Sequence, residues 1–346
     1  MKKISALICA GLMLAGTLSS CAKVGKKASA DSKSLSIVTT IFPEYDWVRN
    51  ILGDNPAQAE VTMLLDNGVD LHSYQPTAQD ILKISTCDLF IYVGGESDEW
   101  VDGVLNQATN KDMIVINLLD VLGEDVKEEE VVEGMQAEEH DHDHDHDEKD
   151  DHDEGEDHDH EHEHEEEVEY DEHVWLSLRN ASTLVNKFTE SISKIDAANA
   201  ETYKKNAAAY VEKLKSLDEE FKTTVSQASV KTVLFGDRFP FRYLVDDYGL
   251  SYYAAFVGCS AESEASFETI TFLSQKVDEC GLPVVLTIEG KDHRIAETIV
   301  SNTKSKDQKI LSMDSMQSTT AADVKNGASY LSAMEKNLSV LKEALK

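Results

Sequence analysis

The chain has 346 residues, of which 41% are hydrophobic, and a formal net charge of −34. Much of that charge is local, because residues 138–172 contain 22 acidic residues and one lysine. The chain has no basic stripe that could neutralise phosphates, which disfavours nucleic-acid binding. Only five cysteines occur, so a disulfide scaffold is excluded, and the length is sufficient for two domains.

Residues 1–20 are typical of a secretory signal peptide. Lys2 and Lys3 precede an apolar stretch over residues 4–18, which is too short for an ordinary membrane span. Small residues then lead directly to Cys21, as in a bacterial lipobox, and residues 21–34 are typical of a flexible tether. A plain cleaved signal, in which Cys21 is incidental, is the alternative. We expect an extracytoplasmic protein that a lipid on Cys21 anchors to the cell membrane.

Residues 35–123 alternate between apolar strands and helices. Strands are expected at residues 35–40, 61–65, 89–93 and 113–118, and helices at residues 43–52, 77–84 and 100–107. Such alternation predicts a parallel sheet that helices cover on both faces. We therefore expect an N-terminal α/β lobe here.

Residues 124–169 are dominated by Glu, Asp and His, which predicts a disordered insert. Nine histidines lie in this insert: His140, His142, His144, His146, His152, His158, His160, His162 and His164. Neutral imidazole is a favoured ligand for zinc, copper and nickel. A solvated charge run would account for the acids but not for so many histidines. We expect an accessory metal-binding loop, with zinc favoured and nickel or copper as alternatives.

The rest of the chain predicts a long connecting helix and a second lobe. Residues 174–226 read as continuously helical and contain no proline, so residues 170–228 are assigned to one connecting helix. Strands are then expected at residues 232–235, 252–256, 284–288 and 309–313, and helices at residues 242–248, 267–279, 294–303 and 322–345. The fold class is therefore α/β, with two lobes of parallel sheet joined by a long rigid helix; residues 229–346 form the C-terminal lobe.

Three cysteines remain outside the signal region, namely Cys87, Cys259 and Cys280. Cys259 and Cys280 could form a disulfide in an oxidising compartment, and Cys87 would then be left over. Sequence spacing alone does not establish the geometry that a disulfide requires, so both states stay open.

Two histidines outside the insert are candidate metal ligands. Apart from the insert, the chain contains only His72, His173 and His293. His72 follows the strand expected at residues 61–65, and His173 lies where the insert meets the long helix. Each stands at the end of an element that faces the expected cleft, which favours a shared metal site over two separate packing histidines.

The segments around these histidines resemble a known family. Residues 70–80 read DLHSYQPTAQD, which is similar to the DPHSYEPTPQD motif of zinc- and manganese-binding receptors of bacterial ABC importers, the ZnuA/TroA-like family. Residues 171–177 read DEHVWLS, which resembles the family's DPHVWLSP motif. The segments at residues 40–43 and 248–250 also fit, so the resemblance covers essentially the whole mature chain. It implies the metal-receptor class of periplasmic-binding-protein-like folds.

The resemblance implies that His72 and His173 are ligands and that the second lobe completes the site. Asp314 follows a late strand, where the family has its final ligand, although a turn or helix-cap role is the alternative. The family's third ligand, a His or Glu, is missing because Gly236 stands at that position. Asp237, Glu289 and His293 are the candidates to replace it: the first is adjacent, the second follows a strand, and the third lies four residues further on.

By this resemblance, the protein is a solute-binding lipoprotein that captures Zn²⁺, with Mn²⁺ as the alternative cargo. It would act as a monomer and deliver the ion to an ABC permease that works with a cytoplasmic ATPase. An extracellular metal buffer or adhesin that works through the His-rich insert is the competing function. We expect no enzyme, because the chain has no HExxH motif on an expected helix, no GxSxG elbow and no Gly-rich phosphate loop.

Overall fold

The computed structural model describes residues 34–136, 169–260, 264–290 and 292–346. Ser34–Lys346 form one compact unit. The expected signal peptide, Cys21, the tether up to residue 33 and the nine insert histidines lie outside the described residues. The boundaries and roles expected for those segments therefore stay predictions.

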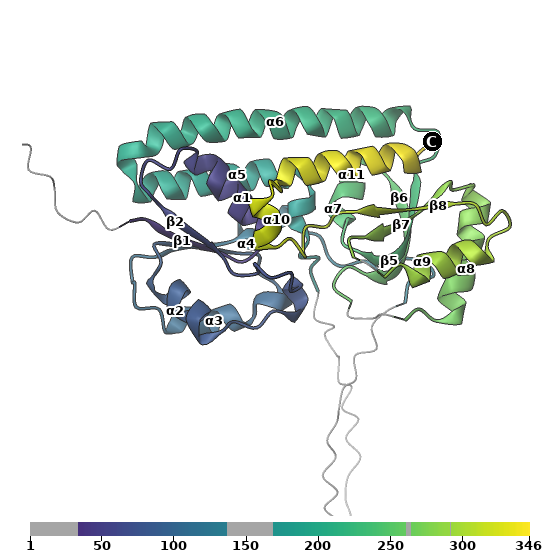
Figure 1. Ribbon diagram of the computed structural model, residues 1–346, viewed down its shortest axis with the longest axis horizontal. Helices are drawn as coiled ribbons and strands as arrows, with labels where there is room; N and C mark the ends of the chain where they lie inside the picture. Colours follow the sequence, from purple (N-terminus) through teal and green to yellow (C-terminus); the bar gives the residue numbers. More distant parts are fainter. Residues whose placement is uncertain (1–33, 137–168, 261–263, 291) are drawn as a thin grey trace, which may run out of the picture. The chain divides into compact units, whose positions relative to one another are not determined.

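The N-terminal lobe is built on a four-stranded parallel sheet with the order β2-β1-β3-β4. Its strands are β1 (Ser36–Thr39), β2 (Glu60–Met63), β3 (Leu89–Tyr92) and β4 (Ile114–Asn117). Its helices are α1 (Phe42–Leu52), α2 (Ala78–Thr86), α3 (Trp100–Asn106) and α4 (Leu118–Leu122). Figure 1 shows α1 on one side of the sheet and α2 and α3 on the other, as expected for strands that need crossover connections.

The C-terminal lobe repeats this plan with a second parallel sheet, of order β6-β5-β7-β8. Its strands are β5 (Thr232–Phe239), β6 (Ser251–Val257), β7 (Val284–Ile288) and β8 (Lys309–Met313). Its helices are α7 (Arg242–Tyr248), α8 (Phe267–Cys280), α9 (Arg294–Asn302), α10 (Ala321–Lys325) and α11 (Tyr330–Ala344). Every residue of β7 is buried, because α9 and α11 both pack against it. The expected α/β fold with two parallel sheets is confirmed.

The expectation of one continuous helix over residues 174–226 is wrong. The segment forms two helices, α5 (Leu178–Ile195) and α6 (Ala200–Gln227), which pack against each other. The break lies at Asp196, whose side chain accepts a 2.7 Å hydrogen bond from the Asn199 side chain and ends α5. Short polar side chains of this kind compete with the helical backbone and favour turns.

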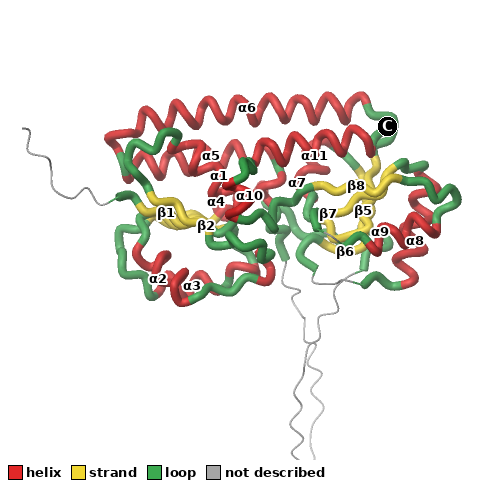
Figure 2. Tube along the Cα trace, in the orientation of Figure 1, coloured by secondary structure: helices red, strands yellow, loops and turns green. Residues whose placement is uncertain are grey.

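Long helices tie the two lobes together. α6, which has 28 residues, packs against α1 of the N-terminal lobe and α7 of the C-terminal lobe. α11 packs against α1 and also against β7 and β8, and Figures 1 and 2 show α6 running alongside both lobes. One cluster of buried apolar side chains includes residues from both sheets, so the lobes share a core. None of the helices in the described residues has the length and apolar character to cross a bilayer.

Two further segments differ from expectation. Residues 124–136 belong to the predicted disordered insert, yet Val126 and Val132 pack against the core and Gln136 pairs with Phe256 of β6. The apolar side chains in this stretch supply the burial that orders it. The helix expected at residues 322–345 is divided into α10 and α11, because Gly327 between them has a φ of +97°.

Candidate metal centre

Loops at the carboxyl ends of the strands carry the candidate ligands, as is usual in open α/β sheets. His72 lies in the 3-10 helix Leu71–Ser73, which follows β2 and has Asp70 as its N-cap. The Asp70 side chain accepts a 3.1 Å hydrogen bond from the His72 backbone N–H. His173 directly precedes the 3-10 helix Val174–Leu176, and Cys259 follows β6 in the C-terminal lobe.

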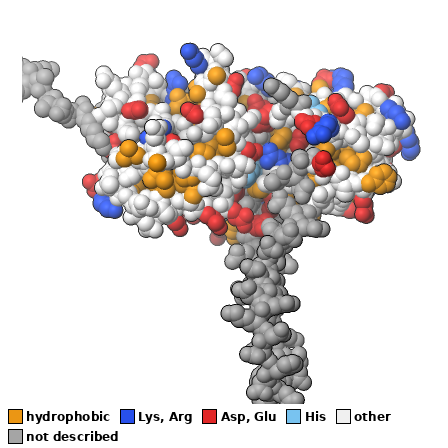
Figure 3. All heavy atoms as spheres, turned by 60° about the horizontal axis from the view of Figure 1, so that its bottom comes forward, with side chains coloured by type: hydrophobic (Ala, Val, Ile, Leu, Met, Phe, Trp, Pro, Cys, Tyr) orange, Lys and Arg blue, Asp and Glu red, His pale blue; other side chains and the backbone are white. Residues whose placement is uncertain are grey.

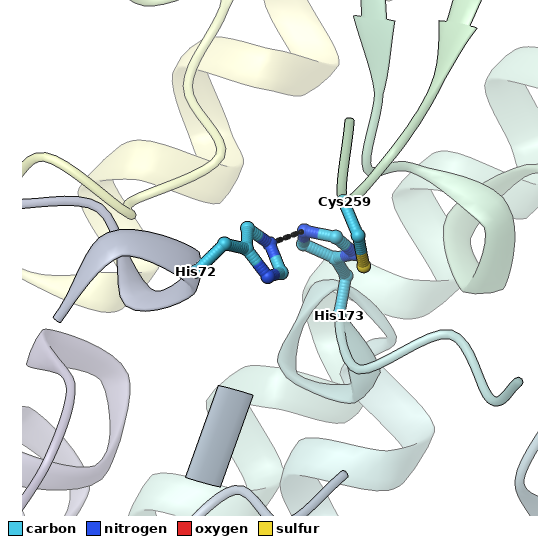
Figure 4. A group of neighbouring side chains, drawn as sticks. All are labelled: His72, His173 and Cys259. Atoms are coloured by element: carbon cyan, nitrogen blue, oxygen red, sulfur yellow. Dashed lines mark hydrogen bonds between the residues drawn. The ribbon is translucent and has the colours of Figure 1, made fainter. Parts of the chain in front are cut away.

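His72, His173 and Cys259 form a group that could hold a metal ion. Each side chain offers one ligand atom, and these atoms lie within 4.8 Å of one another. The two imidazoles approach through their Nε2 atoms, which are 3.3 Å apart, and Figure 4 shows the thiol beside the His173 ring. Within the part of the chain that the structure describes, it is the one group of three such side chains close enough to share an ion.

Neighbouring side chains fix the orientation of both imidazoles. Asp171 accepts hydrogen bonds through Oδ1 from the His173 backbone N–H at 2.8 Å and from ring Nδ1 at 3.0 Å. Nδ1 of His72 lies 2.7 Å from the Ser97 hydroxyl oxygen. A histidine that uses Nδ1 in this way presents Nε2 to a metal, which is the usual arrangement of an outer shell around metal ligands.

The distance between the imidazoles suits tetrahedral zinc. Zinc binds histidine nitrogen at about 2.0–2.1 Å, so two nitrogens in a tetrahedral arrangement stand about 3.3 Å apart. The Nε2 atoms of His72 and His173 are separated by this distance in the structure. Without an ion, one ring can donate a hydrogen bond to the other at this distance, and a metal ion that binds here would take the place of that proton.

Burial and neighbouring charges adjust the protonation of the group. Burial, together with the nearby His173, lowers the pKa of His72 to about 3, so this ring is neutral at physiological pH. Burial acts to lower the pKa of His173, but the adjacent Asp171 carboxylate outweighs burial and raises it above the ordinary value. Burial and the Asp171 charge raise the pKa of the Cys259 thiol. A metal ion that binds here must therefore displace a proton from sulfur.

An acidic cavity opens onto the group. It has a volume of about 430 Å³, and its lining includes His72, Cys259 and five glutamates: Glu96, Glu99, Glu129, Glu169 and Glu172. In Figure 3, acidic side chains gather near the middle of the face shown. A cleft lined by one sign of charge raises the local concentration of oppositely charged ions, here cations.

The three carboxylates expected as ligands do not join this group. Asp237 accepts hydrogen bonds from the backbone N–H groups of Arg238 and Ile288, at 2.9 and 3.3 Å. Glu289 accepts from the backbone N–H groups of Ser315 and Gln317, at 2.7 and 3.2 Å.

Asp314 behaves in the same way, because its Oδ1 atom accepts a 2.9 Å hydrogen bond from the Met316 backbone N–H. Each of the three carboxylates thus orders backbone of the C-terminal lobe. His293, the other candidate, caps the start of α9 and also stands outside the group.

Sequence reasoning missed Cys259. The sequence favours it only as a possible disulfide partner of Cys280, but in the structure both cysteines are free thiols. The available signal was its place directly after a strand of the second lobe, where ligands of open α/β sheets lie.

An ion pair joins the two lobes next to the site. Arg238, at the end of β5, donates a 2.9 Å hydrogen bond to Oδ2 of Asp70 in the N-terminal lobe. The Arg238 guanidinium also donates to the backbone carbonyl of Ser260 at 3.3 Å. The loop that carries His72 is thereby tied to the loop that carries Cys259.

Comparison with known proteins identifies relatives over nearly the whole chain. Residues 37–344 match the family described as zinc-uptake complex component A, periplasmic (ZnuA). The chain is 33% identical over 347 residues to the zinc-binding lipoprotein AdcA of Streptococcus pneumoniae (strain ATCC BAA-255 / R6), covering 99% of this chain and 61% of AdcA. It is 30% identical over 330 residues to the high-affinity zinc uptake system protein ZnuA of Bacillus subtilis (strain 168), covering 95% of this chain and 93% of that protein.

Solved structures agree with these relatives. The Zn(II)-bound ZnuA-like domain of S. pneumoniae AdcA superposes with a TM-score of 0.66 at 29% identity, over 90% of this chain and 99% of that one. The metal-dependent lipoprotein YcdH of B. subtilis gives a TM-score of 0.68 at 25% identity, over 90% of this chain and 99% of that one. The chain spans 61% of the length of AdcA, so the likeness to AdcA concerns that part only. The chain belongs to the ZnuA family of zinc-uptake components.

Proposed function

We propose that this protein is an extracytoplasmic receptor that captures one zinc ion between its lobes and delivers it to an ABC permease. The observation that carries the proposal is the pair of imidazoles from different loops, with Nε2 atoms 3.3 Å apart and their Nδ1 atoms held by Asp171 and Ser97. The relatives support zinc as the cargo, because AdcA is named a zinc-binding lipoprotein and the B. subtilis protein a zinc uptake protein.

The same kinship supports a location at the membrane and a membrane partner. A lipid on Cys21 would hold the receptor at the cell membrane, where a permease with its cytoplasmic ATPase receives the ion. The family is described as one component of a zinc-uptake complex, which supports a membrane partner. Receptor families of this kind bind and release a cargo rather than convert it.

The geometry suggests how the ion is held and released. His173 lies between the lobes. The turn after it is tied to the C-terminal lobe, since Trp175 Nε1 donates to the Ser315 carbonyl at 2.8 Å and the Tyr330 hydroxyl donates to the Trp175 carbonyl at 2.7 Å, while Glu172 before it accepts a 2.9 Å hydrogen bond from the Ser97 backbone N–H of the N-terminal lobe. His72 belongs to the N-terminal lobe. A bound ion would bridge the lobes, so a small shift of one loop suffices for release while the shared core resists wide opening.

A competitive zinc titration of the whole chain tests the proposal. Zinc is titrated against a chelator of known affinity for the wild type, the variant His72→Ala/His173→Ala, and the control His293→Ala. We expect one tight site in the wild type and the control, and its loss in the double variant, with affinity lowered by more than about 100-fold, since outer-shell changes alone cost about 10–100-fold. Weaker binding to the insert histidines would be common to all three proteins. A tight site that survives in the double variant would contradict the proposal and favour a metal buffer that works through the insert.

A further inference from the structure

We propose that the Cys259 thiolate is the third metal ligand and that it makes the site selective for zinc and similarly soft divalent ions over manganese. The inference rests on the proposed function, because it concerns the same site. The family's sequence pattern has no cysteine ligand at this place. A cysteine ligand would favour zinc over manganese, the two cargoes that the sequence leaves open.

The structure leaves no room for a ligand side chain at residue 236, where the resemblance in sequence places the family's third ligand. Gly236 lies in the middle of β5, and a Cβ added there would stand 2.7 Å from the Cα atom and 2.9 Å from the Cβ atom of Ala296 in α9. A histidine or glutamate at residue 236 would therefore force α9 away from the sheet. The third ligand must come from another position.

The neighbouring strand supplies that position. β6 pairs with β5 in parallel, with Val257 beside Phe239 at the carboxyl ends of the two strands, and Cys259 lies two residues beyond Val257. A Cβ added at Gly258 would lie 2.9 Å from Cε1 of His173 and 3.0 Å from the Phe239 carbonyl oxygen. Glycine therefore allows the end of β6 to approach the His173 ring, and this approach places the Cys259 thiol beside it.

The other candidate ligands in the C-terminal lobe are already engaged. Asp237, Glu289 and Asp314 accept hydrogen bonds from backbone N–H groups, which a shift toward the metal would break. Arg238 lies close enough for its charge to act on His72, and its ion pair with Asp70 offsets that charge. Within the residues that the structure describes, two imidazole nitrogens and one sulfur therefore form the ligand set, and His72 and Cys259 also line the cavity of about 430 Å³.

This ligand set has a consequence for the cargo. Thiolate and imidazole favour zinc, whereas manganese prefers carboxylate, carbonyl and water oxygens. A tetrahedral site with three protein ligands and one open position is a normal zinc geometry. The open position also allows a ligand from an acceptor in the transport complex to bind the ion. Three protein ligands therefore suit a cargo that has to be released.

Cobalt(II) spectroscopy of the whole chain tests the assignment directly. Cobalt replaces zinc in such sites, and a cobalt–thiolate bond gives a sulfur-to-metal charge-transfer band in the near ultraviolet. Residues 137–168 contain no cysteine, so ions bound to the insert cannot produce this band. The variants are Cys259→Ser, Cys259→His and the control Cys280→Ser, whose side chain is also a half-buried free thiol.

We expect the band in the wild type and in Cys280→Ser at one equivalent of cobalt, and its absence from both Cys259 variants. The ratio of zinc to manganese affinity should fall at least about tenfold in Cys259→Ser, the scale on which metal-site contacts act. Cys259→His should keep tight zinc binding without the band, which separates loss of the thiolate from loss of the fold. If wild-type protein binds cobalt through His72 and His173 without a sulfur band, the Cys259 assignment is overturned while the receptor function stands.

Discussion

At the scale of single residues, the candidate centre depends on groups that do not touch the ion. The Asp171 carboxylate holds both the backbone and the ring of His173, and Ser97 contacts the Nδ1 atom of His72. These contacts fix which ring nitrogen faces the cleft before an ion arrives. The ordering of the ligands is thus achieved during folding rather than at the moment of binding.

The substitution Asp171→Asn tests this outer shell. The amide keeps the size of the side chain but removes the negative charge that makes His173 a stronger donor to the metal. We expect zinc affinity to fall by about 10–100-fold, measured by competition with a chelator. Asp292→Asn is the matched control, because the Asp292 carboxylate is exposed and pairs with Arg294. Equal affinities in the two variants would show that the Asp171 carboxylate has no such role.

The two histidines of the candidate centre could be picked out from the sequence, whereas the place of Cys259 beside them could not. The DLHSY and DEHVW segments carry His72 and His173 with their local partners, so the signal is contained in a few consecutive residues. The position of Cys259 depends on the pairing of β5 with β6 and on the close approach of Gly258 to the His173 ring, which only the folded chain reveals.

At the scale of elements, the ends of β5 and β6 decide which side chains reach the cleft. Gly258 is the point of closest approach, because its backbone lies against the His173 ring. The order of strands and helices along the chain was evident from apolar runs and turn residues. The breaks at Asp196 and Gly327 were missed because helical periodicity continues on both sides of each.

Gly258→Ala should disturb the site without touching a ligand. The added methyl group would lie 2.9 Å from Cε1 of His173, so the ring or the end of β6 must move. We expect weaker zinc binding and a lower melting temperature of the metal-free protein. Gly103→Ala in α3 is the control, because a Cβ there has no atom within 4 Å, and alanine should stabilise the helix by about 0.5–1 kcal/mol. Unchanged zinc affinity in Gly258→Ala would argue against a tight approach of β6 to His173.

At the scale of the whole molecule, a shared core joins the lobes, and it contains a buried acid. Glu44 in α1 is fully buried and accepts a 2.8 Å hydrogen bond from the Thr40 backbone N–H. Burial raises the pKa of Glu44 to about 8 from an ordinary value of 4.5, and the Asp98 carboxyl adds to the rise. The folded protein therefore holds this proton more tightly than the unfolded chain does.

This difference predicts how stability depends on pH. The stabilising contribution of protonated Glu44 is complete below pH 4.5 and is lost as the pH rises through about 8. We expect the free energy of unfolding, measured with denaturant, to fall between about pH 5 and pH 8 in the wild type, and to fall less in Glu44→Gln. Glu60→Gln, at an exposed position of β2, should retain the wild-type slope. Identical slopes in wild type and Glu44→Gln would contradict the prediction.

A crystal structure of the protein with one equivalent of zinc would show directly whether the ion binds between the lobes. Anomalous diffraction recorded at the zinc edge would locate the ion. We predict a single strong peak between the lobes, about 2.0–2.1 Å from Nε2 of His72 and of His173 and about 2.3 Å from the sulfur of Cys259. A peak that lies away from both histidines, or one coordinated by Asp237, Glu289 or Asp314 in place of them, would contradict the account.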